Sequence, residues 1–83
     1  MANVLKRKLL KLATWNVRGL TSVHKQELLG EECARYEIDV EAVQETKIKD
    51  SDEKRLHTNH KLILLEQKTA AYRGLGFVID KKW

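Results

Sequence analysis

Two strand-like segments that each end at a polar residue, with one helix-length segment between them, constrain the fold of this chain most. In residues 9–16 apolar and more polar positions alternate with the period of a strand, and Asn16 stands at the end. Residues 39–44 have the pattern of a second short strand, and Glu45 follows it. A strand–helix–strand crossover makes its two strands parallel, which places both carboxyl ends at one edge of the sheet. We therefore expect Asn16 and Glu45 to lie side by side.

Residues 23–37 carry the helix pattern that this crossover needs. Three residues have the spacing of one apolar stripe along a helix, namely Leu29, Cys33 and Tyr36. Thr21 or Ser22 can cap the amino end of the helix. Gly30 lies within the segment and lowers helix stability by roughly 1 kcal/mol relative to alanine. We expect Cys33, on the apolar stripe, to lie in the core.

The remaining residues predict two more strands and one long loop. Residues 46–60 are strongly polar and predict a surface loop, with a helical turn near residues 51–56. Residues 62–65 and 75–80 are apolar runs typical of strands buried on both faces, and residues 67–74 connect them. The predicted fold class is therefore α/β, with about four strands in one sheet and one crossover helix. Strands buried on both faces need a second layer, which one sheet and one helix do not supply.

Composition narrows the class of protein without identifying its partner. The 83 residues carry a formal net charge of +4, which suits a polyphosphate partner, and a hydrophobic share of 42% is too high for disorder. A single cysteine cannot form a disulfide within the chain, so we expect an intracellular location, nuclear or cytoplasmic. No apolar run has the length of a membrane span, and residues 1–8 have the character of a short basic arm rather than a signal peptide.

The expected meeting of Asn16 and Glu45 suggests a metal site. One amide oxygen and one carboxylate suit Mg²⁺, which is often held by one or two carboxylates together with water and substrate phosphate. Each residue also has an ordinary explanation, because asparagine is common in turns and a glutamate after a strand is commonly a surface residue. His57 and His60 have a ligand-like spacing, but the sequence places no residue to complete a zinc site with them.

Three sequence motifs resemble those of a known enzyme family. The run Leu-Lys-Leu-Ala-Thr-Trp-Asn-Val-Arg-Gly at 10–19, followed by Val-Gln-Glu-Thr at 43–46, resembles the start of the endonuclease/exonuclease/phosphatase (DNase I-like) family. Within that family, Arg-Gly-Leu at 18–20 and Gly-Leu-Gly-Phe-Val-Ile at 74–79 are most similar to the apurinic-type endonuclease of non-LTR (LINE-type) retrotransposons. The resemblance implies a DNase I-like α/β sandwich of two packed sheets, of which residues 9–83 would be the N-terminal portion with the second sheet missing.

The resemblance also implies roles for particular residues. Glu45 would be a catalytic metal ligand, and Asn16 would share the metal and phosphate site, with Mg²⁺ as the cofactor of the complete domain. Many apurinic endonucleases carry an acidic residue where this chain has Arg18, so a third carboxylate near the metal is not implied. Four residues could contact the phosphates of duplex DNA, namely Arg18, Lys47, Tyr72 and Arg73. An ordinary turn explains Arg18, Tyr72 and Arg73 equally well, and a solvated loop is the favoured explanation of Lys47.

The predicted function is that of a truncated magnesium-dependent phosphodiesterase whose parent domain nicks DNA. The chain alone would be inactive, because the family's catalytic histidine and aspartate belong to motifs that this sequence lacks. Two alternatives stay open. The chain could be a non-catalytic basic module that binds nucleic acid, or part of a relative that acts on RNA or phospholipid phosphodiesters. The apolar sheet surface also predicts self-association.

Overall fold

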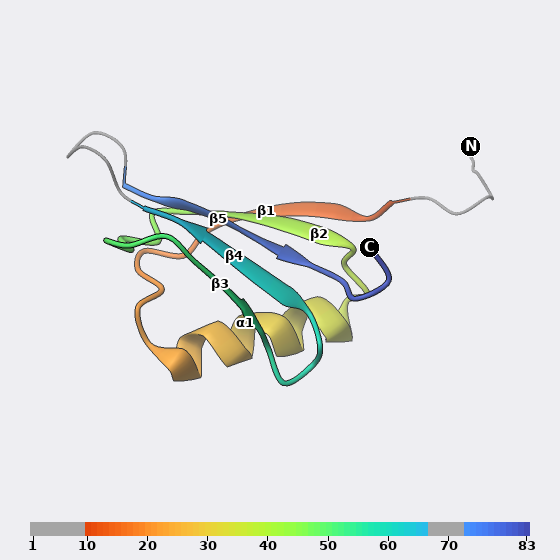
Figure 1. Ribbon diagram of the computed structural model, residues 1–83. Coiled ribbons are helices and arrows are strands. Elements are labelled where there is room, and N and C mark those ends of the chain that lie inside the picture. The colour runs from red at the N-terminus through yellow and green to blue at the C-terminus, as the bar shows by residue number, and fades with distance from the viewer. Residues whose placement is uncertain (1–9, 67–72) are drawn as a thin grey trace.

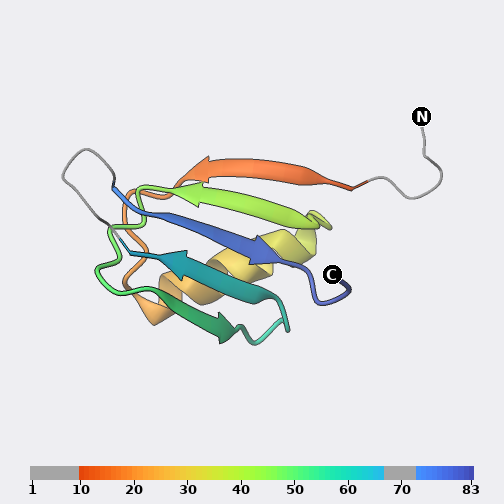
Figure 2. The ribbon, with the colours of Figure 1, turned by 45° about the horizontal axis from the view of Figure 1, so that its top comes forward.

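The computed structural model describes residues 10–66 and 73–83, which form one five-stranded sheet and one helix. The elements in chain order are β1 (Leu12–Asn16), α1 (Val23–Arg35), β2 (Val40–Gln44), β3 (Asp52–Arg55), β4 (Lys61–Leu65) and β5 (Leu75–Ile79). The strand order across the sheet is β1-β2-β5-β4-β3 (Figure 2). The α/β class and the crossover helix are as the sequence predicted.

The crossover from β1 through α1 to β2 fixes the geometry of the sheet edge. The strands β1 and β2 are parallel, with Leu12 opposite Val40 and Asn16 opposite Gln44, whereas the other neighbouring pairs are antiparallel. The helix begins where predicted, because the Ser22 hydroxyl accepts a hydrogen bond from the Lys25 backbone N–H. As expected for a parallel crossover, the carboxyl ends of β1 and β2 lie at the same edge.

The prediction of a loop over residues 46–60 was wrong in one respect, because this segment contains a strand. Residues 52–55 form β3, which pairs antiparallel with β4 at the far edge of the sheet, and no helical turn forms at residues 51–56. All four residues of β3 are charged. An edge strand lies next to solvent and is commonly protected by charge, so its sequence lacks the apolar alternation that marks interior strands.

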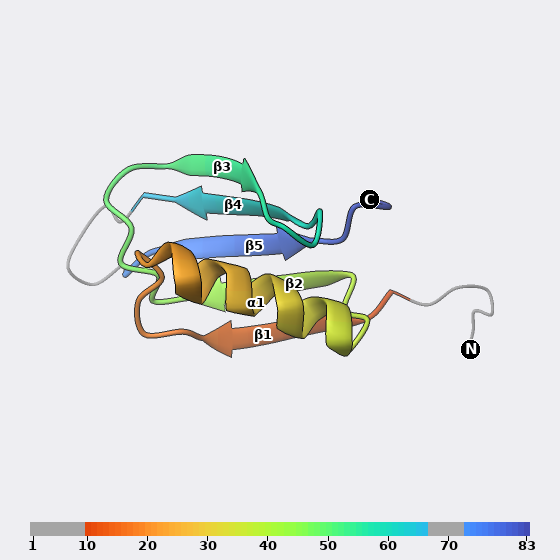
Figure 3. The same cartoon turned by 90° about the horizontal axis from the view of Figure 1, so that it is seen from below.

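The core lies between α1 and one face of the sheet (Figure 3). Strand residues that face α1 are buried, including Val43, Leu62, Leu64 and Val78. Gly30 permits close packing here, because a Cβ at this position would lie 2.7 Å from the Leu56 side chain.

The opposite side of the sheet, which we call the open face, has no covering layer among residues 10–66 and 73–83 (Figure 1). Its half-buried apolar side chains come from three strands and include Ala42, Ile63, Leu75, Phe77 and Ile79. The runs predicted to be buried on both faces are therefore buried only toward α1.

Candidate metal and nucleic-acid site

Asn16 and Glu45 meet at the edge where β1 and β2 end. The side-chain amide Nδ2 of Asn16 donates a hydrogen bond of 2.6 Å to Oε2 of Glu45, although the residues are 29 positions apart. Asn16 is exposed and Glu45 is half-buried. The expected juxtaposition of these two residues is confirmed, and their role as metal ligands stays a prediction.

The backbone of Glu45 is held in a conformation that non-glycine residues seldom adopt. Its φ is +58°, in the left-handed region. Hydrogen bonds hold it on both sides, because its N–H donates to the Gly74 carbonyl at 3.0 Å and its carbonyl accepts from the Gly19 N–H at 2.6 Å. Three separate segments therefore hold the backbone of Glu45 in place, and the hydrogen bond from Asn16 orients its carboxylate.

Left-handed backbone recurs throughout these three segments. Arg18 and Lys47 have φ of +54° and +59°, and Gly19 and Gly74 also have positive φ. For non-glycine residues such conformations cost about 1–3 kcal/mol each and concentrate at functional sites, so the clustering of Arg18, Glu45 and Lys47 supports a site here.

Three of the four predicted phosphate-binding residues lie in these same segments. The side chains of Arg18, Lys47 and Arg73 are exposed, and the Lys47 N–H donates to the Arg73 carbonyl at 2.9 Å. Backbone bonds between residues 17–20 and 44–46 bring the turn that contains Arg18 to the same edge. Tyr72, the fourth, lies outside the described residues.

No sequence pattern indicates the contact between Thr46 and Gly74. Thr46 is fully buried, and its hydroxyl has no hydrogen-bond partner within the described part of the chain. A Cβ on Gly74 would collide with the Thr46 hydroxyl and would lie 3.0 Å from the Lys47 backbone nitrogen. Thr46, which follows Glu45, therefore requires glycine at position 74, directly before β5.

The donor set suits a weakly held, hard cation. Asn16 occupies one carboxylate oxygen of Glu45, which leaves Oε1 for a metal ion. Within residues 10–66 and 73–83 no three histidine, cysteine, aspartate or glutamate side chains are placed to hold a metal together. Glu45 and Asn16 thus fit Mg²⁺ that completes its shell with water and substrate oxygens, rather than an all-protein cage.

The two histidines with ligand-like spacing have other partners. The Nδ1 atom of His57 lies 3.7 Å from a Glu27 carboxylate oxygen, and Nδ1 of His60 lies 2.7 Å from the Thr58 hydroxyl.

A buried acid–thiol pair lies beneath α1, away from the predicted site. The Cys33 thiol donates to Oε1 of Glu41 at 3.2 Å, and both residues are buried. Burial, and then the hydrogen bond to Glu41, raise the pKa of the Cys33 thiol well above its usual range. Cys33 is a core residue, as predicted, and such a thiol is a poor nucleophile.

Comparisons with protein-family models, curated proteins and solved structures gave no match to the chain. Across the described residues there is no helix with the length and hydropathy needed to cross a membrane.

Proposed function

We propose that this chain carries part of the active site of a magnesium-dependent phosphodiesterase of the endonuclease/exonuclease/phosphatase type. The observation that carries the proposal is the hydrogen bond of 2.6 Å between Asn16 and Glu45 at the shared end of two parallel strands. Its further support is the motif resemblance, since both residues occupy the positions at which that family binds metal and phosphate. The DNase I-like fold remains part of this proposal.

In this proposal Glu45 would hold the cation through its carboxylate, and the hydrogen bond from Asn16 fixes that carboxylate in place. Bound Mg²⁺ supplies a Lewis acid that offsets negative charge on the phosphate as it is attacked. Two backbone hydrogen bonds hold the left-handed backbone of Glu45 in place, which adds to this preorganisation.

The favoured substrate is the phosphate backbone of DNA. Three exposed cations flank the Asn16–Glu45 pair, namely Arg18, Lys47 and Arg73, and each phosphate contact adds to the salt dependence of binding. Arginine suits this task because its planar fork matches two phosphate oxygens. The retrotransposon-like sequence of residues 18–20 and 74–79 favours DNA over RNA or phospholipid as the substrate.

The chain by itself should not cleave DNA. The described residues place no trio of acidic, histidine or cysteine side chains to hold a metal, and both His57 and His60 have partners away from Glu45. The motif resemblance assigns the general base to motifs that this sequence lacks, so the proposal gives that role to no residue of this chain.

Paramagnetic Mn²⁺, which binds oxygen ligands as Mg²⁺ does, tests the cation site directly. In a nuclear magnetic resonance titration, Mn²⁺ should broaden the amide signals of residues 16–19 and 44–47 first, and excess Mg²⁺ should restore them. Glu45→Gln should abolish this localised broadening. Glu53→Gln, which removes an exposed carboxylate on β3, should leave it unchanged. Broadening centred elsewhere, or unaffected by Glu45→Gln, would overturn the metal site.

A plasmid assay tests activity in the same preparation. Supercoiled DNA incubated with the chain and Mg²⁺ should remain uncut. Nicking that Glu45→Ala abolishes would show that the chain holds a complete active site, contrary to our expectation. RNA and phospholipid phosphodiesters, tested in parallel, would identify a different substrate class if either were hydrolysed.

A second candidate function is nucleic-acid binding without cleavage, which the three exposed cations favour by themselves. Fluorescence anisotropy with labelled duplex DNA should then show binding that weakens steeply with salt. Replacing Arg18, Lys47 and Arg73 with glutamine should reduce both the affinity and the salt slope. The matched control replaces Arg35, Arg55 and Lys81, three exposed cations elsewhere, and equal losses in both variants would show that only net charge matters.

A further inference from the structure

The outer edge of β1 has the features of a strand-pairing surface. Within residues 10–66 and 73–83, β1 pairs with β2 alone and forms one edge of the sheet (Figure 2). The opposite edge, β3, is fully charged, whereas β1 carries neither charge nor proline. Charge and proline are the usual protection against strand addition, so β1 is the unprotected edge.

The backbone groups available on this edge can be assigned from the bonds to β2. The Lys11 carbonyl accepts a hydrogen bond from the Val40 N–H at 3.4 Å, and the Val17 N–H donates to the Gln44 carbonyl at 3.0 Å. Successive residues of a strand direct their N–H and C=O groups to opposite sides. The groups of Leu12, Thr14 and Asn16 therefore point away from β2.

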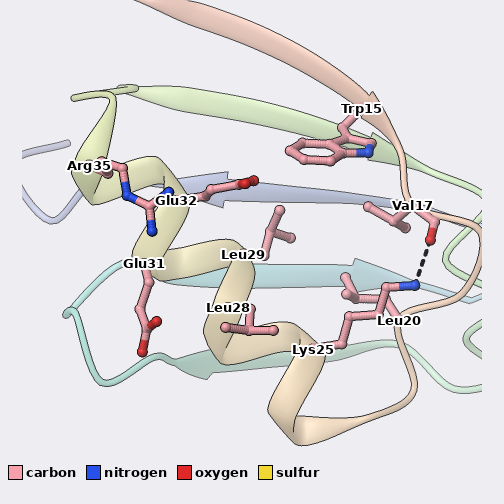
Figure 4. A pocket seen from close by; sticks show the side chains of 9 residues that line it. All are labelled: Trp15, Val17, Leu20, Lys25, Leu28, Leu29, Glu31, Glu32 and Arg35. Atoms are coloured by element: carbon pink, nitrogen blue, oxygen red, sulfur yellow. Dashed lines mark hydrogen bonds between the residues drawn. The ribbon is translucent and has the colours of Figure 1, made fainter.

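An apolar groove runs beside the same edge, between β1 and α1 (Figure 4). Its volume is about 280 Å³, and its apolar lining consists of Trp15, Val17, Leu20, Leu28 and Leu29. Charged α1 residues, among them Glu31, Glu32 and Arg35, form its rim (Figure 4). Trp15 is 46% exposed and Leu12 is 67% exposed, so a strand laid along β1 would bury large apolar side chains on both sides of the sheet.

We propose that β1 pairs antiparallel with β1 of a second copy of this chain, about a two-fold axis at Thr14. In this register Thr14 faces Thr14 of the other copy, and Leu12 faces Asn16. The outward groups of all three residues then form hydrogen-bonded pairs, six bonds in total, because each such pair exchanges two. The two sheets become one continuous sheet of ten strands.

Side-chain size favours a second copy as the occupant. In the same register, Trp15 of each copy lies opposite Ala13 of the other, on the side of the sheet that faces α1. A large side chain therefore meets a small one at both symmetric positions, and Ala13 leaves room for the indole beside the groove. A self-complementary patch of this kind defines an isologous interface. Because only five residues pair, the dimer should be weak and depend on concentration.

The first test removes one outward N–H without touching the bonds to β2. Sedimentation equilibrium in EDTA, without nucleic acid, should show wild type shifting from monomer to dimer as concentration rises. Thr14→Pro should weaken the dimer at least tenfold, because proline lacks the N–H that faces the other copy. Thr14→Val keeps that N–H and should dimerise as wild type does. Circular dichroism and thermal melting verify that each variant folds.

The open face offers a rival mode of association, which Phe77→Thr distinguishes. This substitution removes the aromatic side chain at the middle of the open face and should leave pairing through β1 intact. The proposal is overturned if the chain is monomeric at every concentration. A dimer that survives Thr14→Pro but is lost in Phe77→Thr also overturns it.

Site-specific cross-linking reports the register and does not depend on the proline variant. In a hydrogen-bonded antiparallel pair the two Cα atoms are about 5.5 Å apart, so Thr14→Cys should cross-link efficiently with a bifunctional thiol reagent of matching reach. Two Leu12 residues would be about 13 Å apart along the strands, so Leu12→Cys should cross-link poorly. The native Cys33 is 1% exposed and should not react. Equal yields from the two variants would indicate random collision and overturn the two-fold pairing.

Discussion

The indole Nε1–H of Trp83 donates a hydrogen bond of 3.0 Å to Oδ1 of Asp39, which lies 44 positions earlier in the chain. The other carboxylate oxygen accepts from the Lys11 backbone N–H at 2.7 Å, and the Lys82 ammonium lies 3.0 Å from Oδ1. Asp39 is only 5% exposed. One buried carboxylate therefore joins the start of β1, the start of β2 and the residues after β5, at the end of the sheet opposite Glu45.

Asp39 should stabilise the fold in a pH-dependent way. Burial by itself raises the pKa of Asp39, but the hydrogen bonds from Trp83, Lys11 and Lys82 outweigh it and lower the pKa from 3.8 to about 2. A pKa that is lower in the folded chain than in the unfolded chain gives stability that is present above pH 4 and is lost as the pH falls toward 2.

Asp39→Asn should lower the free energy of unfolding by about 1–3 kcal/mol at pH 7, because it leaves part-buried donors without an anionic acceptor. The variant should also show a shallower loss of stability between pH 4 and pH 2. Urea unfolding at pH 7, 4 and 2.5 measures both effects. Asp50→Asn, at an exposed loop aspartate, is the matched control and should behave as wild type. An unchanged pH profile in Asp39→Asn would show that another carboxylate governs acid stability.

The buried Glu41 should act in the opposite direction. Burial raises its pKa, and the nearby Glu32 adds to this, although the hydrogen bond from Cys33 opposes it. A carboxyl whose folded pKa is raised favours folding at low pH, and this contribution is lost as the pH rises above the ordinary value of 4.5. Glu41 in its charged form therefore destabilises the core at neutral pH.

Glu41→Gln should consequently make the chain more stable than wild type at pH 7 and confer little advantage at pH 4. Urea unfolding at pH 4, 5.5 and 7 should show a difference in unfolding free energy that grows with pH. Glu31→Gln, an exposed glutamate on α1, supplies the control, and its difference from wild type should stay constant. A constant difference for Glu41→Gln would mean that Glu41 keeps an ordinary pKa in the folded chain.

The sequence was most informative where local pattern and a topological rule acted together. Alternation in residues 9–16 and the helix stripe at Leu29 and Cys33 identified β1 and α1, and the crossover rule then placed Asn16 beside Glu45. The charged strand β3 escaped prediction, because its pairing with β4 depends on backbone bonds and leaves no apolar pattern.

Contacts between side chains that are distant in the sequence could not be predicted from a local pattern or from a topological rule. Asp39 resembles any polar residue before a strand, and only the fold brings Trp83 and Lys11 to it. The left-handed backbone at Glu45 and Lys47 was also unforeseen, since neither residue type signals a positive φ. The resemblance indicated which residues form the candidate site, and the structure adds how Glu45 is held.

Gly74 should be among the residues least tolerant of substitution, because two separate effects oppose any side chain there. Its φ of +97° is strained for other residues, at a cost of about 1–3 kcal/mol. A Cβ would also collide with the buried hydroxyl of Thr46. Gly74→Ala should therefore lower the free energy of unfolding by more than the backbone effect alone.

A double-mutant cycle separates these two effects. Thr46→Ala removes the hydroxyl and relieves the collision but not the backbone strain, so Gly74→Ala should cost less in that background than in wild type. The difference between the two costs, measured by urea unfolding, is the steric contribution. Additive costs would show that Thr46 moves aside freely. Because the Gly74 carbonyl accepts from the Glu45 N–H, Gly74→Ala should also shift the Glu45 amide signal, and this would link the packing of Thr46 to the position of the proposed metal ligand.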